Sequence, residues 1–231
     1  MNLDKDIQEL MNYSAVHYAR QYINEEKKFI NEFQKFKNQK NDLRLSMIKA
    51  STYFKIVKNL QTKYEGKKQR FEPIIDIIYE FLNPINDLDS AINLVKIFEE
   101  KLEKIYNNQL YVFSSKILWL FHKEPIIIID KHVRNVLKEE GHRISESDIK
   151  NYYILWMNLY NENIEYVNNA CKILKNIEKV TCYVPFQTNE INSICEEEWF
   201  KQRVFDIYLW FMGSKSKQLY EIKNISTQLD L

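Results

Sequence analysis

Glycine and proline are almost missing from this chain, and their scarcity restricts the possible folds more than any other feature. Only 3 glycines and 4 prolines occur among 231 residues, whereas average usage of the two together is roughly 12%. Tight β-turns rely on residues that accept a positive φ, and glycine does so most readily. Rossmann and P-loop folds bind phosphates with closely spaced glycines, but Gly66, Gly141 and Gly213 lie far apart. The scarcity therefore disfavours these folds and predicts an all-α protein.

Apolar residues recur at the spacing of three and four that defines one face of a helix. The clearest case is Ile92–Ile105. No repeat or low-complexity linker interrupts the chain, so residues 1–231 are interpreted as one unit. Other helices are predicted over residues 73–82, over residues 163–178, from residue 149 onward and up to Gly213. The expected helix-end signals are Asp89 as an N-cap, Ser145 with Asp148 and Ser193 with Glu196 as capping boxes, and Gly213 as a C′ residue.

Charge and cysteine content exclude several classes of protein. The 33 basic and 32 acidic residues give a net charge of +1, so any attraction to nucleic acid or membrane must come from a local patch. Three cysteines without a C-x-x-C spacing disfavour a disulfide framework and a zinc site, and they favour small buried side chains in a reducing compartment. The first residues do not resemble a signal peptide, and no apolar run of roughly 18 residues occurs. We expect a cytoplasmic protein without a metal, a cofactor or a membrane segment.

One lysine lies where the chain is otherwise apolar. Lys116 is in the middle of a predicted helix that is hydrophobic nearly all round, which indicates a buried helix. Such a lysine either extends until its amine reaches water, which is the commoner case, or occupies a desolvated cleft. In a cleft its pKa falls, and a neutral amine becomes an available nucleophile. None of its helical neighbours can pair its charge, since they are Val112, Phe113, Trp119 and Leu120.

A carboxylate follows this lysine at the start of the next predicted helix. Four consecutive isoleucines, Ile126–Ile129, are too few for a helix and predict an extended, buried segment. That segment leads to Asp130, which precedes a predicted helix over Lys131–Glu140. As an N-cap, Asp130 stays ionised, because backbone N–H groups and the helix dipole favour its charge. An aspartate in this position is usually only a cap, but a chain that folds back here brings Lys116 and Asp130 together across one cleft.

Together these residues resemble the helix-hairpin-helix DNA glycosylase superfamily, above all its bacterial branch related to 8-oxoguanine DNA glycosylases. In that superfamily a lysine on a helix precedes an apolar segment and then an apolar-apolar-Asp-x-His motif that opens the next helix. The same order is found in Lys116, Ile126–Ile129, Asp130 and His132. Further similarity to the bacterial branch lies in Ser115-Lys116, Trp119-Leu120-Phe121, Glu124-Pro125 and the C-terminal pattern Trp199-Phe200-x-x-Arg203-Val-Phe205-Asp206.

The resemblance implies a two-lobed helical fold with a cleft between the lobes and a catalytic segment over about residues 108–140. It implies a monomeric DNA glycosylase that flips an oxidised or otherwise modified base out of double-stranded DNA. Lys116 would attack the sugar C1′, with AP-lyase activity as an additional outcome, and Asp130 would stabilise charge or act as a general base. The expected substrates also include the modified bases of phage DNA, which the protein would remove in a defence role. The expected base pocket is Phe113, Trp119, Leu120, Trp199 and Phe200, and the expected DNA contacts are Lys131, His132 and Arg134.

One departure from the superfamily keeps a second interpretation open. The hairpin before the catalytic lysine normally contains a glycine-rich turn whose backbone N–H groups bind a DNA phosphate. Here the corresponding stretch is Asn107–Phe113, which contains no glycine. The alternative is a catalytically inactive helical DNA-binding or regulatory module that keeps the glycosylase fold. Convergence of Lys116 and Asp130 on an open cleft favours the enzyme, whereas a Lys116 amine in bulk solvent favours the module.

Overall fold

The computed structural model describes residues 3–36, 43–60, 69–139, 144–145, 147–176 and 188–214. Within these ranges the regular elements are helices and no strand is present, which confirms the all-α prediction. The α-helices are α1 (Leu3–Gln21), α2 (Lys27–Phe36), α3 (Leu43–Tyr53), α4 (Glu72–Ile78), α5 (Leu88–Tyr106), α6 (Tyr111–His122), α7 (Lys131–Glu139), α8 (Ile149–Glu162), α9 (Ile164–Asn176), α10 (Thr188–Ile194) and α11 (Glu198–Gly213). A π-helical turn covers Tyr22–Glu26, and short 3-10 helices cover Val57–Asn59, Gln69–Phe71 and Tyr79–Phe81.

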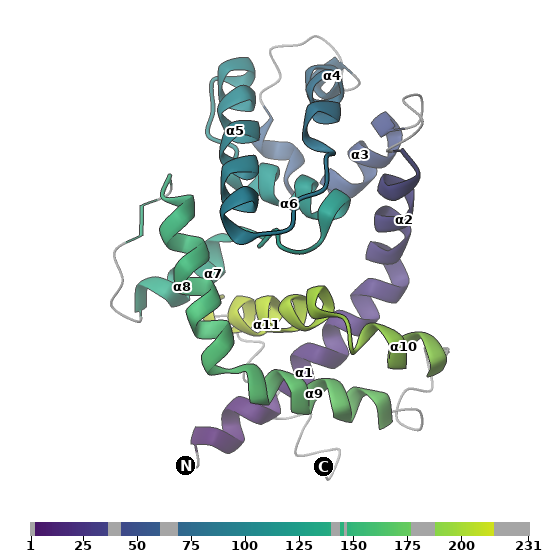
Figure 1. Ribbon diagram of the computed structural model, residues 1–231, viewed down its shortest axis with the longest axis vertical. Helices are drawn as coiled ribbons and strands as arrows, with labels where there is room; N and C mark the ends of the chain where they lie inside the picture. The colour runs from purple at the N-terminus through teal and green to yellow at the C-terminus, as the bar shows by residue number, and fades with distance from the viewer. Residues whose placement is uncertain are drawn as a thin grey trace.

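The helices gather into two groups in space (Figure 1). Helices α3–α6, from the middle of the chain, lie together at the upper end of the view, where α5 packs against α6 and α3 against α4. In the lower group, α1 packs against α9 and α11, and α11 packs against α7. Helix α2 runs from the lower group toward the upper one and contacts both α3 and α6. The first and last described helices of the chain therefore belong to the same group.

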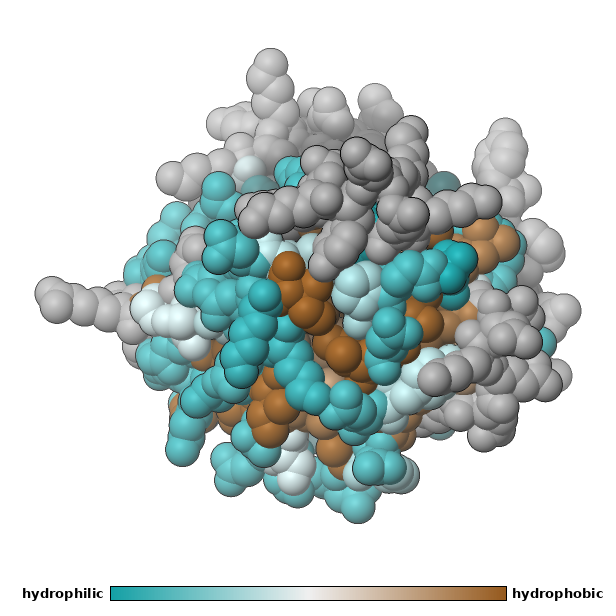
Figure 2. All heavy atoms as spheres, turned by 90° about the horizontal axis from the view of Figure 1, so that it is seen from above, coloured by the Kyte–Doolittle hydropathy of each residue, from teal (hydrophilic) through white to brown (hydrophobic). Residues whose placement is uncertain are grey.

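A single core cluster extends through both groups. Its largest fully buried side chains are mostly aromatic, among them Trp119, Trp156 and Phe98, which is consistent with the large apolar area that such rings bury. Seen from the α3–α6 end, hydrophilic side chains surround smaller apolar areas of the surface (Figure 2). Isolated exposed apolar residues are ordinary in globular proteins. Those with large side chains here come from five different helices and are Leu45, Ile97, Ile154, Ile173 and Met212.

Tyrosine hydroxyls supply hydrogen-bond partners to the backbone of the buried isoleucine segment. In a sheet, a neighbouring strand would supply them. The sequence Ile126–Ile129 is non-helical and buried, in line with the prediction, and its backbone polar groups need partners away from water. The Tyr153 hydroxyl accepts a hydrogen bond from the Ile127 N–H (3.1 Å) and donates to the Ile127 carbonyl (2.9 Å). The Tyr152 hydroxyl donates to the Ile128 carbonyl (3.1 Å). Helix α8 thereby fixes the segment that leads to Asp130.

Substituting Tyr153 by phenylalanine tests this support. We expect the free energy of unfolding to fall by about 1–3 kcal/mol, because the Ile127 N–H and carbonyl lose their partner in a buried place. Urea unfolding measures the difference. Tyr166→Phe is the matched control: its hydroxyl bonds the Asp4 carboxylate at the surface (3.1 Å), so we expect a change below about 0.5 kcal/mol. A Tyr153→Phe variant as stable as the wild type would contradict this role.

Two of the expected helix N-caps are replaced by a nearby residue of the same capping type. Helix α5 is capped by Asp87, whose carboxylate accepts from the Ser90 N–H (2.7 Å), so Asp89 lies inside the first turn. Helix α8 is capped by Asp148, whose carboxylate accepts from the Asn151 N–H (3.0 Å). Asp148 is thus the cap itself rather than the second member of a capping box. Several residues of capping type stand close together at both places, so residue type alone does not decide which of them is the cap.

The last helix differs from the prediction at both ends. Helix α11 begins at Glu198, and Ser193 lies in α10, so the capping box expected of Ser193 and Glu196 does not form. At its other end α11 includes Gly213, which is therefore not a C′ residue. Its role is close packing, because a Cβ atom built at Gly213 would lie 1.9 Å from the His132 carbonyl oxygen of α7. The glycine allows α7 and α11 to approach each other directly beside the candidate site.

Candidate active site

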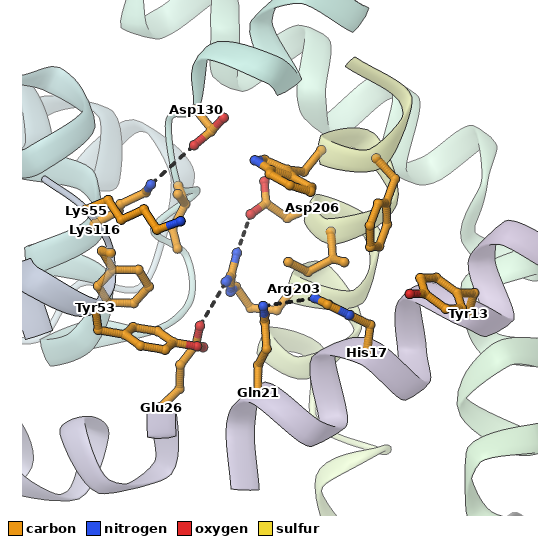
Figure 3. Close-up of a pocket in the computed structure, with 15 residues that line it drawn as sticks. Tyr13, His17, Gln21, Glu26, Tyr53, Lys55, Lys116, Asp130, Arg203 and Asp206 are labelled. Atoms are coloured by element: carbon orange, nitrogen blue, oxygen red, sulfur yellow. Dashed lines mark hydrogen bonds and ion pairs between the residues drawn. The ribbon is translucent and has the colours of Figure 1, made fainter. Parts of the chain in front are cut away.

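Lys116 of α6 and Asp130, which precedes α7, meet in a partly buried position (Figure 3). Lys116 Nζ lies 3.2 Å from Asp130 Oδ2, and the two side chains are only 12% and 16% exposed. The lysine therefore does not extend into bulk water, and the predicted convergence of the two side chains is confirmed. Water screens an ion pair less when it is withdrawn from solvent in this way. The interaction is accordingly stronger than that of an ordinary surface pair.

The Asp130 carboxylate is held in a fixed position. Its Oδ1 atom accepts a hydrogen bond from the His132 N–H (2.9 Å), as expected of an N-cap. The N-terminus of α7 favours negative charge at this place. Just before the aspartate, the Ile129 N–H donates to the Ser115 hydroxyl (2.9 Å). Because Ser115 is the neighbour of Lys116, this bond ties the two halves of the candidate site together.

The pair lies in the wall of a pocket of about 520 Å³, within the range of roughly 300–1,000 Å³ that is typical of ligand sites. Both helix groups contribute to it: α1 and α11 from one, and α6 with the end of α3 from the other. The walls combine aromatic rings with charged side chains. They consist of Tyr13, His17, Gln21, Glu26, Tyr53, Phe54, Lys55, Lys116, Ile128, Asp130, Arg203, Asp206, Ile207, Trp210 and Phe211.

A buried arginine links two acidic groups on another side of the pocket (Figure 3). Arg203 Nη2 lies 3.2 Å from Glu26 Oε1, and Arg203 Nη1 bonds the Asp206 carboxylate. The guanidinium also lies over the rings of Tyr18 (5.0 Å) and Trp119 (5.1 Å), as cation–π contacts do. Arg203 and Asp206 belong to the C-terminal pattern that resembles the glycosylase family, but the pattern alone predicts no role for them. The signal that identifies such a pair is an arginine and an aspartate three residues apart among the apolar residues of one helix.

Burial makes Asp206 a weaker acid than an ordinary aspartate. It raises the pKa of Asp206 to about 6; the positive charge of Arg203 opposes this effect, and the negative charge of Asp130 adds to it. The side chain therefore changes its protonation state just below neutral pH. Its charge state in turn alters the electrostatic environment of Asp130 and Lys116, which both interact with it.

The raised pKa predicts a pH dependence of stability. A carboxyl whose folded pKa exceeds its unfolded value stabilises the fold below the unfolded value of 3.8, and this contribution is lost as the pH rises through about 6. Between about pH 5 and pH 7.5, we therefore expect the wild type to lose about 1 kcal/mol relative to Asp206→Asn. Urea unfolding of both proteins at the two pH values measures this change. A difference between the two proteins that is independent of pH would contradict it.

The five residues expected to form the base pocket lie elsewhere. None of them lines the pocket, and all are buried in the core: Phe113, Trp119, Leu120, Trp199 and Phe200. Trp119 packs against Trp199, with ring centroids 6.3 Å apart, and Phe200 packs against Tyr18 at 5.1 Å. They share helices with Lys116 or Arg203, but their side chains pack between elements instead of facing the cavity. The prediction is corrected: these five residues belong to the core and do not line the pocket.

The rings that do line the pocket come from distant parts of the chain. Tyr13 belongs to α1, Tyr53 ends α3, Phe54 follows it, and Trp210 and Phe211 belong to α11. Tyr13 and Phe211 are in edge contact, with centroids 5.3 Å apart. No local sequence motif connects these residues, so sequence reasoning missed them. Only their common position in the folded chain identifies them.

The three expected DNA contacts differ in accessibility. Lys131 is exposed at the first residue of α7. The His132 ring lies against Trp210 (5.4 Å), and its Nδ1–H donates to the Gly213 carbonyl (3.3 Å). Arg134 is buried, with its guanidinium 5.9 Å from the Tyr152 ring. A buried side chain does not reach a phosphate, so the expectation for Arg134 is corrected, whereas Lys131 keeps a free surface position.

The remaining features concern metals, cysteines and membranes. Among the described residues, no three His, Cys, Asp or Glu side chains cluster in a way that could hold a metal ion. Cys171 and Cys195 are buried and free, and Cys182 lies outside the described residues. None of the helices in the described part of the chain is long and apolar enough to cross a membrane.

Comparison of the chain with known protein families, curated proteins and solved structures found no match. The described part of the chain thus forms an all-helical fold with a lysine–carboxylate pair in a mixed aromatic and charged pocket. Any function must be argued from this site.

Proposed function

We propose that this protein is a DNA glycosylase, with Lys116 as its nucleophile and Asp130 as its electrostatic and general-base residue. The observation that carries the proposal is the 3.2 Å approach of Lys116 Nζ to Asp130 Oδ2 in the wall of the pocket. An amine beside a fixed carboxylate is the pair that attack at a sugar C1′ needs. The order of these residues in the sequence, with its resemblance to the glycosylase superfamily, supports the same assignment.

The two groups of helices would serve as two lobes, with the DNA lying across the cleft between them. In support, Phe54 and Lys116 reach the pocket from the α3–α6 group, and His17 and Trp210 reach it from the other group. Helices α5 and α6 pack together across a short turn, and the turn of this hairpin precedes Lys116. Asn107 supplies the left-handed conformation of that turn (φ 51°), which glycine commonly supplies elsewhere.

The reaction begins when a modified base leaves the duplex and enters the pocket, at an unstacking cost of a few kcal/mol. Lys116 transfers a proton to Asp130, which lies within hydrogen-bond distance, and the freed amine attacks C1′. The bond from C1′ to the base breaks, and the base leaves with the bonding electron pair and takes up the proton that Asp130 received from Lys116. The Asp130 carboxylate, restored by this proton transfer, then offsets the positive charge that develops on the sugar and on the attached amine.

Opening of the sugar ring then gives a Schiff base between Lys116 and C1′. Abstraction of a proton from C2′ breaks the bond to the 3′ phosphate oxygen by β-elimination, which is the lyase activity. Hydrolysis of the Schiff base frees the lysine. The tyrosine, phenylalanine and tryptophan rings of the pocket provide surfaces on which a flipped base stacks. Oxidised bases and other modified bases, including those of phage DNA, are the proposed substrates.

One observation favours the alternative of a binding or regulatory module without activity. The Leu110 N–H at the hairpin turn donates to the Glu99 carboxylate (2.9 Å). This backbone group is therefore already satisfied within the protein and does not face a DNA phosphate. A protein of this second type binds DNA but releases no base.

A panel of duplex oligonucleotides that carry different modified bases separates the two functions. The panel includes 8-oxoguanine, glucosylated hydroxymethylcytosine and an unmodified duplex, and mass spectrometry measures the released base. The proposal expects release from at least one of the modified duplexes and none from the unmodified one. Binding to every duplex without release of any base would instead support the inactive module.

A further inference from the structure

The cations that line the pocket differ in whether an acidic group neutralises them. Lys116 is paired with Asp130, and Arg203 is bonded to Glu26 and Asp206. Lys55 is exposed and has no carboxylate partner among the residues that the structure describes. Figure 3 shows its side chain reaching into the pocket from the same side as Lys116. The amine of Lys55 is therefore available to an anionic group of a ligand.

The backbone at Lys55 has a conformation that lysine rarely adopts. Its φ is 56°, in the left-handed region. The Lys55 N–H donates to the Thr52 carbonyl (3.1 Å), and the Ile56 N–H donates to the Ser51 carbonyl (2.9 Å). These two bonds form the Schellman motif that ends α3, in which the left-handed position is usually glycine. A residue with a Cβ atom is disfavoured there.

The amine of Lys55, unpaired within the described residues, and its unfavourable backbone conformation together indicate that the side chain binds a ligand. Asn107 occupies the same left-handed region at the end of α5, and asparagine tolerates that region well. Lysine at the equivalent place after α3 has a less favourable backbone conformation, and it places a free amine at the pocket. Unfavourable backbone conformations of this kind occur preferentially at functional sites. The local strain is explained if the amine binds part of the substrate.

We propose that Lys55 binds a phosphodiester group of the DNA strand that carries the flipped nucleotide. This inference rests on the proposed function, because that function brings DNA to this pocket. A lysine ammonium is a compact charge that binds phosphate without a fixed geometry, and phosphate contacts position nucleic acid on a protein. The contact would strengthen binding of the strand that carries the flipped nucleotide at the pocket.

Binding measurements over a series of salt concentrations test the proposal. The probe is duplex DNA with a stable abasic analogue, and the variants are Lys55→Gly, Lys55→Gln and Lys55→Arg. We expect Lys55→Gly and Lys55→Gln to bind roughly tenfold more weakly, and the slope of log K against log salt to decrease in magnitude by about 0.9. Lys55→Arg keeps the charge and should keep the slope. Lys58→Gln is the control, since Lys58 is exposed in the next turn but does not line the pocket.

Thermal unfolding distinguishes loss of the contact from loss of the fold. We expect Lys55→Gly to have a melting temperature equal to that of the wild type or higher by roughly 2–4 °C, because glycine relieves the backbone strain. A variant that is more stable and binds DNA more weakly supports the proposal. Unchanged affinity and unchanged salt slope in both neutral variants would overturn it. An equal loss of affinity for a free mononucleotide would also overturn it, because the phosphate would then not need to belong to a DNA strand.

Base release at saturating DNA separates this proposal from the function on which it rests. If the neutral variants release base as the wild type does once DNA saturates them, Lys55 serves binding and the excision reaction stands. If the wild type binds DNA through Lys55 but releases no base, the excision reaction fails and the Lys55 contact stands. Absence of any DNA binding by the wild type overturns both.

Discussion

Replacing Lys116 by glutamine is expected to abolish the covalent complex that borohydride traps between this protein and abasic DNA. Glutamine has a similar length but offers no nucleophilic amine, so no Schiff base forms and there is nothing to reduce. Base release should become about 10³-fold slower or more, as is usual when a covalent nucleophile is lost. Gel separation of the trapped complex and single-turnover kinetics of base release measure the two effects.

Lys123 offers a matched control, because it is the other lysine of this region with an unusual environment. Burial lowers the pKa of Lys123, and its Nζ lies 4.4 Å from the centre of the Trp199 ring. It is thus a competing nucleophile on chemical grounds, but it does not line the pocket. Lys123→Gln should form the trapped complex as the wild type does. Trapping that survives in Lys116→Gln and disappears in Lys123→Gln would contradict the assignment.

Replacing Asp130 by asparagine is expected to slow base release by about 10²–10⁴-fold while leaving the protein folded. The charge that stabilises the sugar and accepts the lysine proton is lost. Asparagine is as good an N-cap as aspartate, so the bond from the His132 N–H to this side chain is retained. Single-turnover rates at saturating DNA, combined with thermal unfolding, separate a catalytic effect from a structural one.

Asp87→Asn is the corresponding control at a helix end outside the pocket. Asp87 caps α5 through the Ser90 N–H in the same manner as Asp130 caps α7, and it is exposed to solvent. We expect the same rate of base release as in the wild type. Equal rates in wild type, Asp87→Asn and Asp130→Asn would show that Asp130 is only a cap.

The sequence was sufficient for the helical class and for the central pair of the site. The glycine content is a property of the whole sequence, and the spacing of apolar residues is read over a few helical turns. Both therefore predict helices without knowledge of the tertiary structure. Lys116 and Asp130 were found in the same way, as a charge in an apolar helix and a cap after an apolar run. The contact between Lys116 and Asp130 joins residues that are close in the sequence, so local sequence patterns were enough to predict it.

The rest of the pocket depends on long-range packing. Tyr13, Tyr53 and Trp210 become neighbours only because α1, α3 and α11 converge on one cavity. Conversely, Phe113 and Trp119 share a helical face with Lys116 but are covered by other elements. The position of a residue on a helix determines the direction in which its side chain points. The neighbouring elements decide whether the side chain meets a cavity or the core there.

The role of single residues at helix ends was also beyond local reasoning. Gly213 was expected to end a helix, whereas the structure gives it a place where α7 and α11 approach closely. Lys55 carried no signal in the sequence, because its significance depends on a backbone angle and on the position of the pocket. Both features follow from contacts between elements, and sequence patterns do not encode such contacts directly.

Identification of the residue that forms the covalent bond to DNA tests the central claim most directly. The wild-type protein is incubated with duplexes that carry modified bases or abasic sites, reduced with borohydride, digested and examined by peptide mass spectrometry. The proposed mechanism predicts a deoxyribose-derived adduct on Lys116 and on no other lysine. An adduct on a different residue, or no adduct with any duplex while Lys116→Gln still releases base, would contradict it.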